Sequence, residues 1–119
     1  MKAKEIYENA LALNISRIDD EDDLEFFAVK LMNILLAEVF ENNNQIRCKK
    51  GLPKLAQPTK VSTIDADTQY EAELYAPMCY ALAAKLLQAQ EETSLAAVYN
   101  NQYVTLLQLV TPAVEMEVV

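Results

Sequence analysis

The most apolar part of the chain is residues 26–40, where only Lys30, Asn33 and Glu38 are polar. A surface helix usually carries one apolar stripe, whereas this segment is apolar around most of its circumference. We therefore expect a helix over residues 23–42 that lies at the centre of a bundle or against another subunit.

A shorter amphipathic pattern precedes it. Ile6, Ala10 and Leu13 fall at near-helical spacing and predict a helix over residues 3–14, with Asn14 as its stop.

The helical pattern breaks over residues 43–67, because the asparagines at 42–44 and then Gly51, Pro53 and Pro58 interrupt it. The basic side chains of this stretch are Arg47, Lys49, Lys50, Lys54 and Lys60. We expect a basic, extended connection. Because a compact domain rarely leaves about 25 residues without structure, the connection is expected to be either mobile or held by a partner.

A new helix start follows the connection, because Thr68 and Glu71 have the spacing of a capping box. The helix is expected to run to about Gln90. Pro77 should either kink it or begin a new segment, since its ring removes one N–H and crowds the preceding turn.

A final helix is predicted by one apolar stripe near the C-terminal end, and it should form an antiparallel hairpin with the helix before it. The stripe consists of Leu95, Val98, Tyr99, Tyr103, Leu106 and Val110.

The last residues alternate between apolar and acidic, with Val114, Met116 and Val118 at a strand-like period of two. Such a tail either lacks order or adds to an edge on another chain. Together the patterns predict an all-α fold: a small bundle of about four helices with a long extended connection between helices 2 and 3. The helical domain is assigned to residues 1–110 and the strand-like tail to residues 111–119.

Composition narrows the classes of function. The 119 residues include 18 acidic and 10 basic side chains, a formal net charge of -8, so a broad basic face for nucleic acid is not expected. The sequence contains no His and one Gly, which excludes His-based acid–base catalysis and glycine-rich phosphate loops. We expect a protein that is not an enzyme.

Cys48 and Cys79 are too few for a structural zinc site without His, so no metal or other cofactor is expected. The chain opens without a secretory signal, and no apolar run reaches the roughly 20 residues that a membrane span needs. We expect free thiols in a reducing cytoplasm and no membrane association.

The acidic run that begins at Asp19 is not an EF-hand loop, because its sixth and twelfth positions hold Leu24 and Lys30. Its carboxylates, paired with those of the next helix, are also similar to the magnesium ligands of all-helical nucleotide pyrophosphohydrolases. However, Glu25 and Glu38 on one helix would lie roughly 20 Å apart at about 1.5 Å per residue, too far to share ions.

The order of elements resembles the head-to-tail connector proteins of long-tailed bacteriophages, also called adaptor or head completion proteins. The resemblance covers about residues 3–107 and rests on three segments: 35–39 (LLAEV), 75–83 (YAPMCYALA) and 96–103 (AAVYNNQY). Relatives often carry Gly where this chain has Ala81.

This resemblance implies a non-enzymatic virion subunit that is assembled in the host cytoplasm and placed at the head–tail interface. Its copies, typically twelve in this family, would form a ring between the portal protein and the tail or stopper protein. DNA would pass through the channel without specific binding. The formal net charge of -8 leads to the separate hypothesis that acidic charge facing the channel keeps DNA from sticking. The family has no catalytic residues to transfer.

Three groups of residues are candidates for contacts with neighbouring subunits or with the portal: apolar residues of the long helix, basic residues of the connection, and residues of the last helix and tail. They are Phe27, Leu31, Leu35, Phe40, Arg47, Lys49, Lys50, Lys54, Tyr99, Tyr103, Val114, Met116 and Val118. The alternative is a small helical interaction or regulatory module that forms a dimer or tetramer through residues 26–40.

Overall fold

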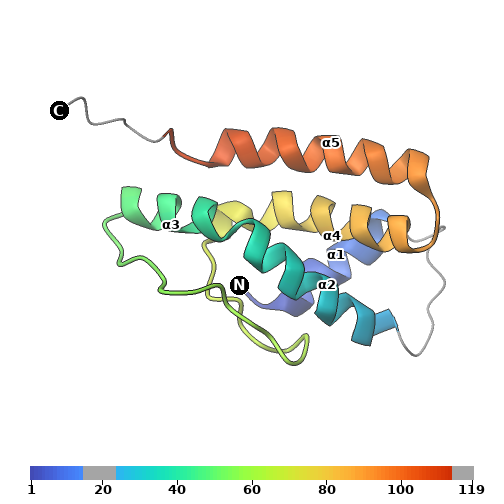
Figure 1. Cartoon of the computed structure of the whole chain (residues 1–119), viewed down its shortest axis with the longest axis horizontal. Coiled ribbons are helices and arrows are strands. Elements are labelled where there is room, and N and C mark those ends of the chain that lie inside the picture. The colour runs from blue at the N-terminus through green and yellow to red at the C-terminus, as the bar shows by residue number, and fades with distance from the viewer. Residues whose placement is uncertain (15–23, 114–119) are drawn as a thin grey trace.

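The computed structural model describes residues 1–14 and 24–113 (Figure 1). These residues form five α-helices and one 3₁₀ turn: α1 (Ala3–Leu13), α2 (Leu24–Glu38), α3 (Phe40–Lys49), η1 (Ala72–Leu74), α4 (Tyr75–Ala89) and α5 (Thr93–Val110). Within the described ranges, the β-type pairing is a single bridge between Lys2 and Asp67. The all-α fold and the long connection are confirmed.

Helix α4 is the centre of the bundle, and α1, α2 and α5 all pack on it. Nine of its fifteen residues are buried. Ala81, Ala83 and Ala84 are among them, and their small side chains let the neighbouring helices approach closely. Helices α4 and α5 form the predicted antiparallel hairpin, with α5 at one edge of the molecule and α1 and α2 on the other side of α4 (Figure 1).

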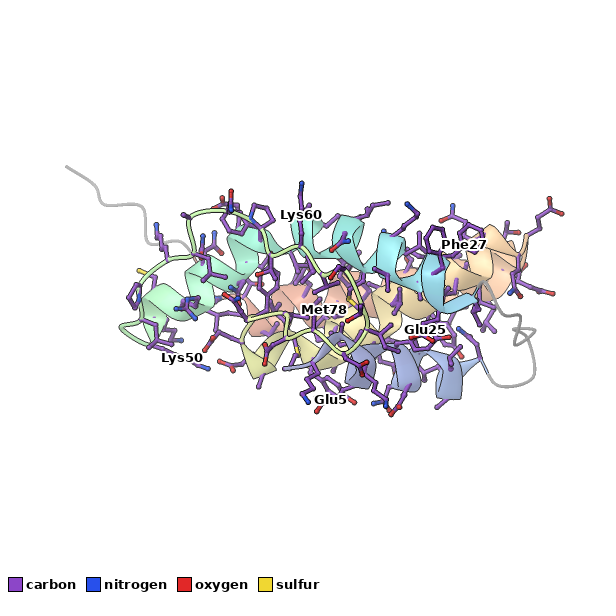
Figure 2. The ribbon with its side chains drawn as sticks, turned by 90° about the horizontal axis from the view of Figure 1, so that it is seen from below. Glu5, Glu25, Phe27, Lys50, Lys60 and Met78 are labelled. Atoms are coloured by element: carbon purple, nitrogen blue, oxygen red, sulfur yellow. The ribbon has the colours of Figure 1, made fainter. Side chains whose placement is uncertain are left out.

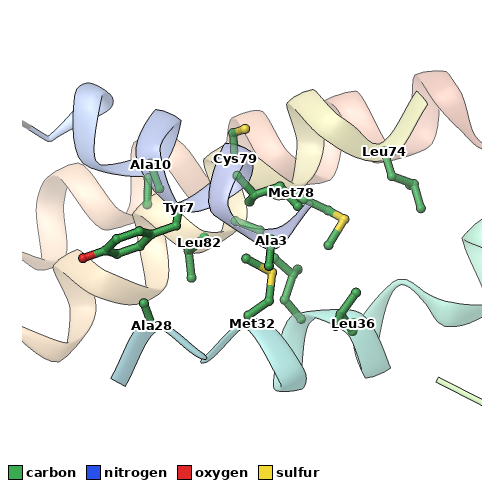
Figure 3. Close-up of a cluster of buried hydrophobic side chains, with 14 of the residues drawn as sticks. Ala3, Tyr7, Ala10, Ala28, Met32, Leu36, Leu74, Met78, Cys79 and Leu82 are labelled. Carbon is green, nitrogen blue, oxygen red and sulfur yellow. The ribbon is translucent and has the colours of Figure 1, made fainter. Parts of the chain in front are cut away.

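The core lies where α1, α2 and α4 meet (Figure 3). Tyr7 and Ala28 face each other across it, and Met32 and Met78 fill the space beside them with flexible side chains. On α2, burial follows one stripe only. Its buried residues are Leu24, Ala28, Met32, Leu35 and Leu36.

The capping box was a wrong prediction. Thr68 instead ties the connection to the N-terminus: its hydroxyl donates to the Met1 carbonyl at 2.8 Å and accepts the Tyr70 N–H at 3.3 Å. Helix α4 begins only at Tyr75, so Pro77 lies in its first turn, where its missing N–H costs nothing. Of the two alternatives for Pro77, the start of a new segment is therefore confirmed.

The second predicted helix was ended too early. Beyond a single irregular residue, Val39, the chain continues as α3 to Lys49, whereas residues 43–49 were expected to be extended. Asn43 and Asn44 resemble helix breakers in the sequence, but their side chains bond to the backbone of distant residues instead of to their own backbone. Asn43 Oδ1 accepts the Glu71 N–H at 2.8 Å, and Asn44 Oδ1 accepts the Leu55 N–H at 2.8 Å.

The connection is held by its own chain, which is neither of the two alternatives expected. The Asn33 side chain accepts the Val61 N–H at 2.8 Å and donates to the Val61 carbonyl at 2.9 Å. Arg47 Nε donates to the Pro53 carbonyl at 2.7 Å. Side chains of the helices thus supply the backbone partners that a sheet would otherwise give.

Candidate interaction surfaces

The outer side of α5 is the largest unexplained feature of the surface. Only Ala96 and Tyr103 of its eighteen residues are buried. No Asp, Glu, Lys or Arg occurs from Thr93 to Val110, although more than half of these positions are exposed. A solvent-facing helix normally carries charges opposite its apolar stripe, so α5 has the composition of a helix that another surface covers.

Three apolar side chains on this side of α5 face solvent. Val98 is 59% exposed, Val104 42% and Leu109 76%. Val98 belongs to the predicted apolar stripe of this helix, but it lies outside the core. We refer to the exposed side of α5 as the α5 outer face.

A second surface, which is apolar, lies on α2. Phe26, Phe27 and Ile34 are 60%, 55% and 53% exposed, and we call these three residues the α2 face. The two phenylalanine rings meet edge to face, with centroids 5.8 Å apart, and the Lys30 ammonium lies 4.9 Å from the Phe26 ring centroid. The α2 helix is thus apolar on its outer side as well as its inner side, as the pattern predicted.

The other apolar candidates divide between core and boundary. Leu35 is fully buried, while Leu31 and Phe40 are half-buried against the core. Figure 2 shows Phe27 at one end of the molecule and Lys50 at the other, so the predicted interface residues do not form one patch.

Two of the basic candidates are engaged within the chain. Arg47 donates to Glu71 at 3.1 Å, and Lys50 lies between Glu71 at 3.2 Å and Glu73 at 2.7 Å. The hydrogen bond to Glu73 is the main reason that the pKa of Lys50 is raised, and the same bond lowers the pKa of Glu73. This cluster fastens the end of α3 to the turn before α4.

The remaining basic candidates, Lys49 and Lys54, are exposed. Together with Cys48 and Pro112 they line a shallow pocket between α3, the connection and the end of α5.

The tyrosine candidates fasten α5 to the bundle. The Tyr99 hydroxyl donates to the Leu13 carbonyl at 2.8 Å, and the Tyr99 ring packs against Tyr80 with centroids 5.8 Å apart. The Tyr103 hydroxyl lies 3.4 Å from Glu38, whose other oxygen accepts Lys85 at 2.7 Å. Burial, with the nearby Glu38 charge, raises the pKa of Tyr103. Both tyrosines point inward, away from the α5 outer face.

The cysteines are unpaired: Cys48 is exposed and Cys79 is buried. Burial raises the pKa of the Cys79 thiol to about 11, which makes it a poor nucleophile. Among the described residues, no group of three His, Cys, Asp or Glu side chains could hold a metal ion. Glu38 accepts a hydrogen bond from the Lys85 ammonium. Residues 19–23 of the acidic run lie outside the described ranges.

The tail candidates Val114, Met116 and Val118 also lie outside the described residues. The start of the tail is fixed by two hydrogen bonds: Thr111 Oγ1 accepts Asn42 Nδ2 at 3.0 Å and donates to the Leu107 carbonyl at 2.6 Å. None of the described helices is long and apolar enough to cross a membrane.

Comparison with known proteins found no matching family model, no curated relative and no similar solved structure.

Sequence reasoning missed the α5 outer face, although a signal for it was present. Apolar periodicity predicts the helix and places Val98 in its apolar stripe, but it does not reveal the outer side. The informative feature was the absence of charge over the eighteen residues of α5 in a chain that carries 28 charged side chains in total.

Proposed function

We propose that this chain is a structural subunit of a homo-oligomeric ring of the head-to-tail connector type. In this role it joins a portal protein to a tail or stopper protein, and DNA passes through the ring without specific binding. The chain acts by contact with its neighbours and performs no catalysis.

One observation carries the proposal: two separate surfaces that the described chain leaves uncovered, the apolar α2 face and the charge-free α5 outer face, lie on helices that pack on the central helix α4. A chain with one such surface can form a two-fold dimer, which leaves no surface free for a further copy. Two surfaces that point in different directions allow each copy to contact more than one neighbour, which a larger assembly requires.

The strength of the fold around these surfaces supports the same role. Tyr99 and Tyr103 fasten α5 to the bundle, and the Arg47 and Lys50 ion pairs fasten the end of α3 to the turn before α4. The two surfaces are thus presented on a fixed scaffold, which reduces the entropy lost when neighbours dock.

The second candidate function is a small interaction or regulatory module that forms a closed dimer or tetramer. The charge-free α5 outer face favours it, because one helix face is sufficient for a two-fold contact.

Electron microscopy of the full chain mixed with the portal protein encoded nearest to its gene tests the proposal. The expected result is an additional ring of density at the narrow end of the portal. Phe27→Ser on the α2 face should abolish this ring, whereas Leu52→Ser, at a 41% exposed apolar position of the connection, should leave it intact. Failure of the wild-type chain to bind the portal, with a closed dimer in solution, would replace the connector with the interaction module.

A further inference from the structure

The α5 outer face contains a seam with coiled-coil spacing. Val98, Gln102, Thr105 and Leu109 follow one another at steps of four, three and four residues, and all four are exposed. This is the spacing of the contact positions of paired helices. Leu95 and Leu106, both half-buried, border the seam and widen its apolar surface.

The seam is complementary to itself in the antiparallel direction. When two copies of α5 run in opposite directions about a two-fold axis at the middle of the seam, Val98 of each copy lies opposite Leu109 of the other. Gln102 then lies opposite Thr105. Apolar residues meet apolar residues at both ends, and an amide meets a hydroxyl in the middle, where they can exchange a hydrogen bond. A parallel pairing would leave each Gln102 facing another Gln102.

Charge also selects a second copy as the occupant. The chain has a formal net charge of -8, so two copies that approach through most of their surface bring like charges together. The α5 outer face carries no charge, so two acidic copies can dock there without that cost. A basic or nucleic-acid partner would gain nothing from a neutral face, since its attraction depends on opposite charge.

We propose that the α5 outer face pairs antiparallel with the same face of a second copy, with Val98 against Leu109 and Gln102 against Thr105. The central Gln and Thr fix the register, as polar residues at contact positions do in coiled coils. The contact is two-fold and uses α5 alone, so it does not depend on the proposed ring function.

The size of the contact sets the expected affinity. An α-helix of eighteen residues is about 27 Å long. One helix laid along another is a small interface compared with those of obligate dimers. The dimer should therefore dissociate on dilution, and a concentration series is needed to observe it.

A charge-exchange experiment tests both the contact and its direction. Val98→Glu and Leu109→Lys each bury an unpaired charge against an apolar residue, so each should weaken dimerisation by at least about tenfold in sedimentation equilibrium. The double variant places Glu against Lys at both ends of an antiparallel pair and should restore dimerisation. In a parallel pair it would place Glu against Glu and Lys against Lys.

The substituted residues suit the helix, because Glu and Lys are both good helix formers and Leu109 lies in the last turn, where a base favours the helix dipole. Circular dichroism should show unchanged helicity. Ile34→Glu on the α2 face changes the net charge as Val98→Glu does and should leave dimerisation unchanged.

Two outcomes would overturn the inference: a wild-type chain that stays monomeric over the whole concentration series, or a double variant as weakly associated as the single variants. If Ile34→Glu loses portal binding but still dimerises through α5, the result bears on the ring function and leaves the α5 contact unaffected. The two proposals can therefore be tested separately.

Discussion

Helices α4 and α5 form one hairpin and have similar apolar character, yet they differ sharply in burial. Helix α4 contains a single charged residue, Lys85, and α5 contains none. Nine of fifteen residues are buried in α4 but only two of eighteen in α5. The difference arises because α4 has neighbours on several sides, whereas α5 packs mainly on α4.

An apolar helix requires partners that bury its surface, and the packing of the rest of the chain determines whether this requirement is met. For α4 it is met by α1, α2 and α5. For the α5 outer face it is unmet among the described residues, which is the physical basis for assigning that face to a second molecule.

The largest expected effect comes from truncating one leucine in each helix. Leu82 of α4 is fully buried, so Leu82→Ala should lower the free energy of unfolding by about 2–5 kcal/mol through lost burial and a residual cavity. Leu109→Ala, at a 76% exposed position of α5, should change it by less than about 0.5 kcal/mol. Urea denaturation at a concentration where the chain is monomeric measures both. A similar loss for the two variants would contradict the assignment of Leu109 to the surface.

A smaller effect should distinguish the inner side of α5 from its outer face. Tyr99→Phe removes the hydroxyl that donates to the Leu13 carbonyl and should cost about 0.5–1.5 kcal/mol. Tyr80→Phe is the matched control, since the described structure gives the Tyr80 hydroxyl no hydrogen bond and the ring contact with Tyr99 is kept. Equal stability of the Tyr99 variant and wild type would show that this bond does not hold α5 in place.

The smallest expected effect is a pH dependence of stability that arises from the contact between Lys50 and Glu73 at the turn before α4. The hydrogen bond from Lys50 lowers the pKa of Glu73, so its contribution to stability is present above the ordinary glutamate pKa. That contribution is lost as the pH falls through the lowered value. Glu73→Gln should therefore destabilise the protein slightly at neutral pH and reduce the further loss on acidification.

Urea midpoints at neutral and acidic pH measure the difference. Asp65→Asn, which changes another exposed carboxylate of the connection, serves as the control. The same acid sensitivity in the Glu73 variant and in wild type would exclude this contact as its source.

Much of the fold could be predicted from local sequence signals. The first helix and its stop at Asn14, the last helix and the hairpin all follow from periodicity and punctuation. The extension of the second helix through α3 could not, because Asn43 and Asn44 look like breakers until their backbone partners at Glu71 and Leu55 are known. Such long-range hydrogen bonds leave no trace in a local pattern.

The candidate surfaces were only partly predictable for a related reason. The excess apolar character of α2 was visible in the sequence, and the α2 face confirms that one helix stripe is left over. Arg47 and Lys50 were assigned outward roles because the sequence does not show that Glu71 and Glu73 fold back onto them. Periodicity alone also could not decide which side of α5 meets α4.

Methyl NMR spectra recorded during dilution test the central claim most directly, that the outward side of α5 is completed by another molecule. The methyl signals of Val98 and Leu109 should shift with protein concentration, while those of the buried Ile6 and Leu82 stay constant. Constant Val98 and Leu109 signals together with concentration-dependent shifts elsewhere would contradict the account.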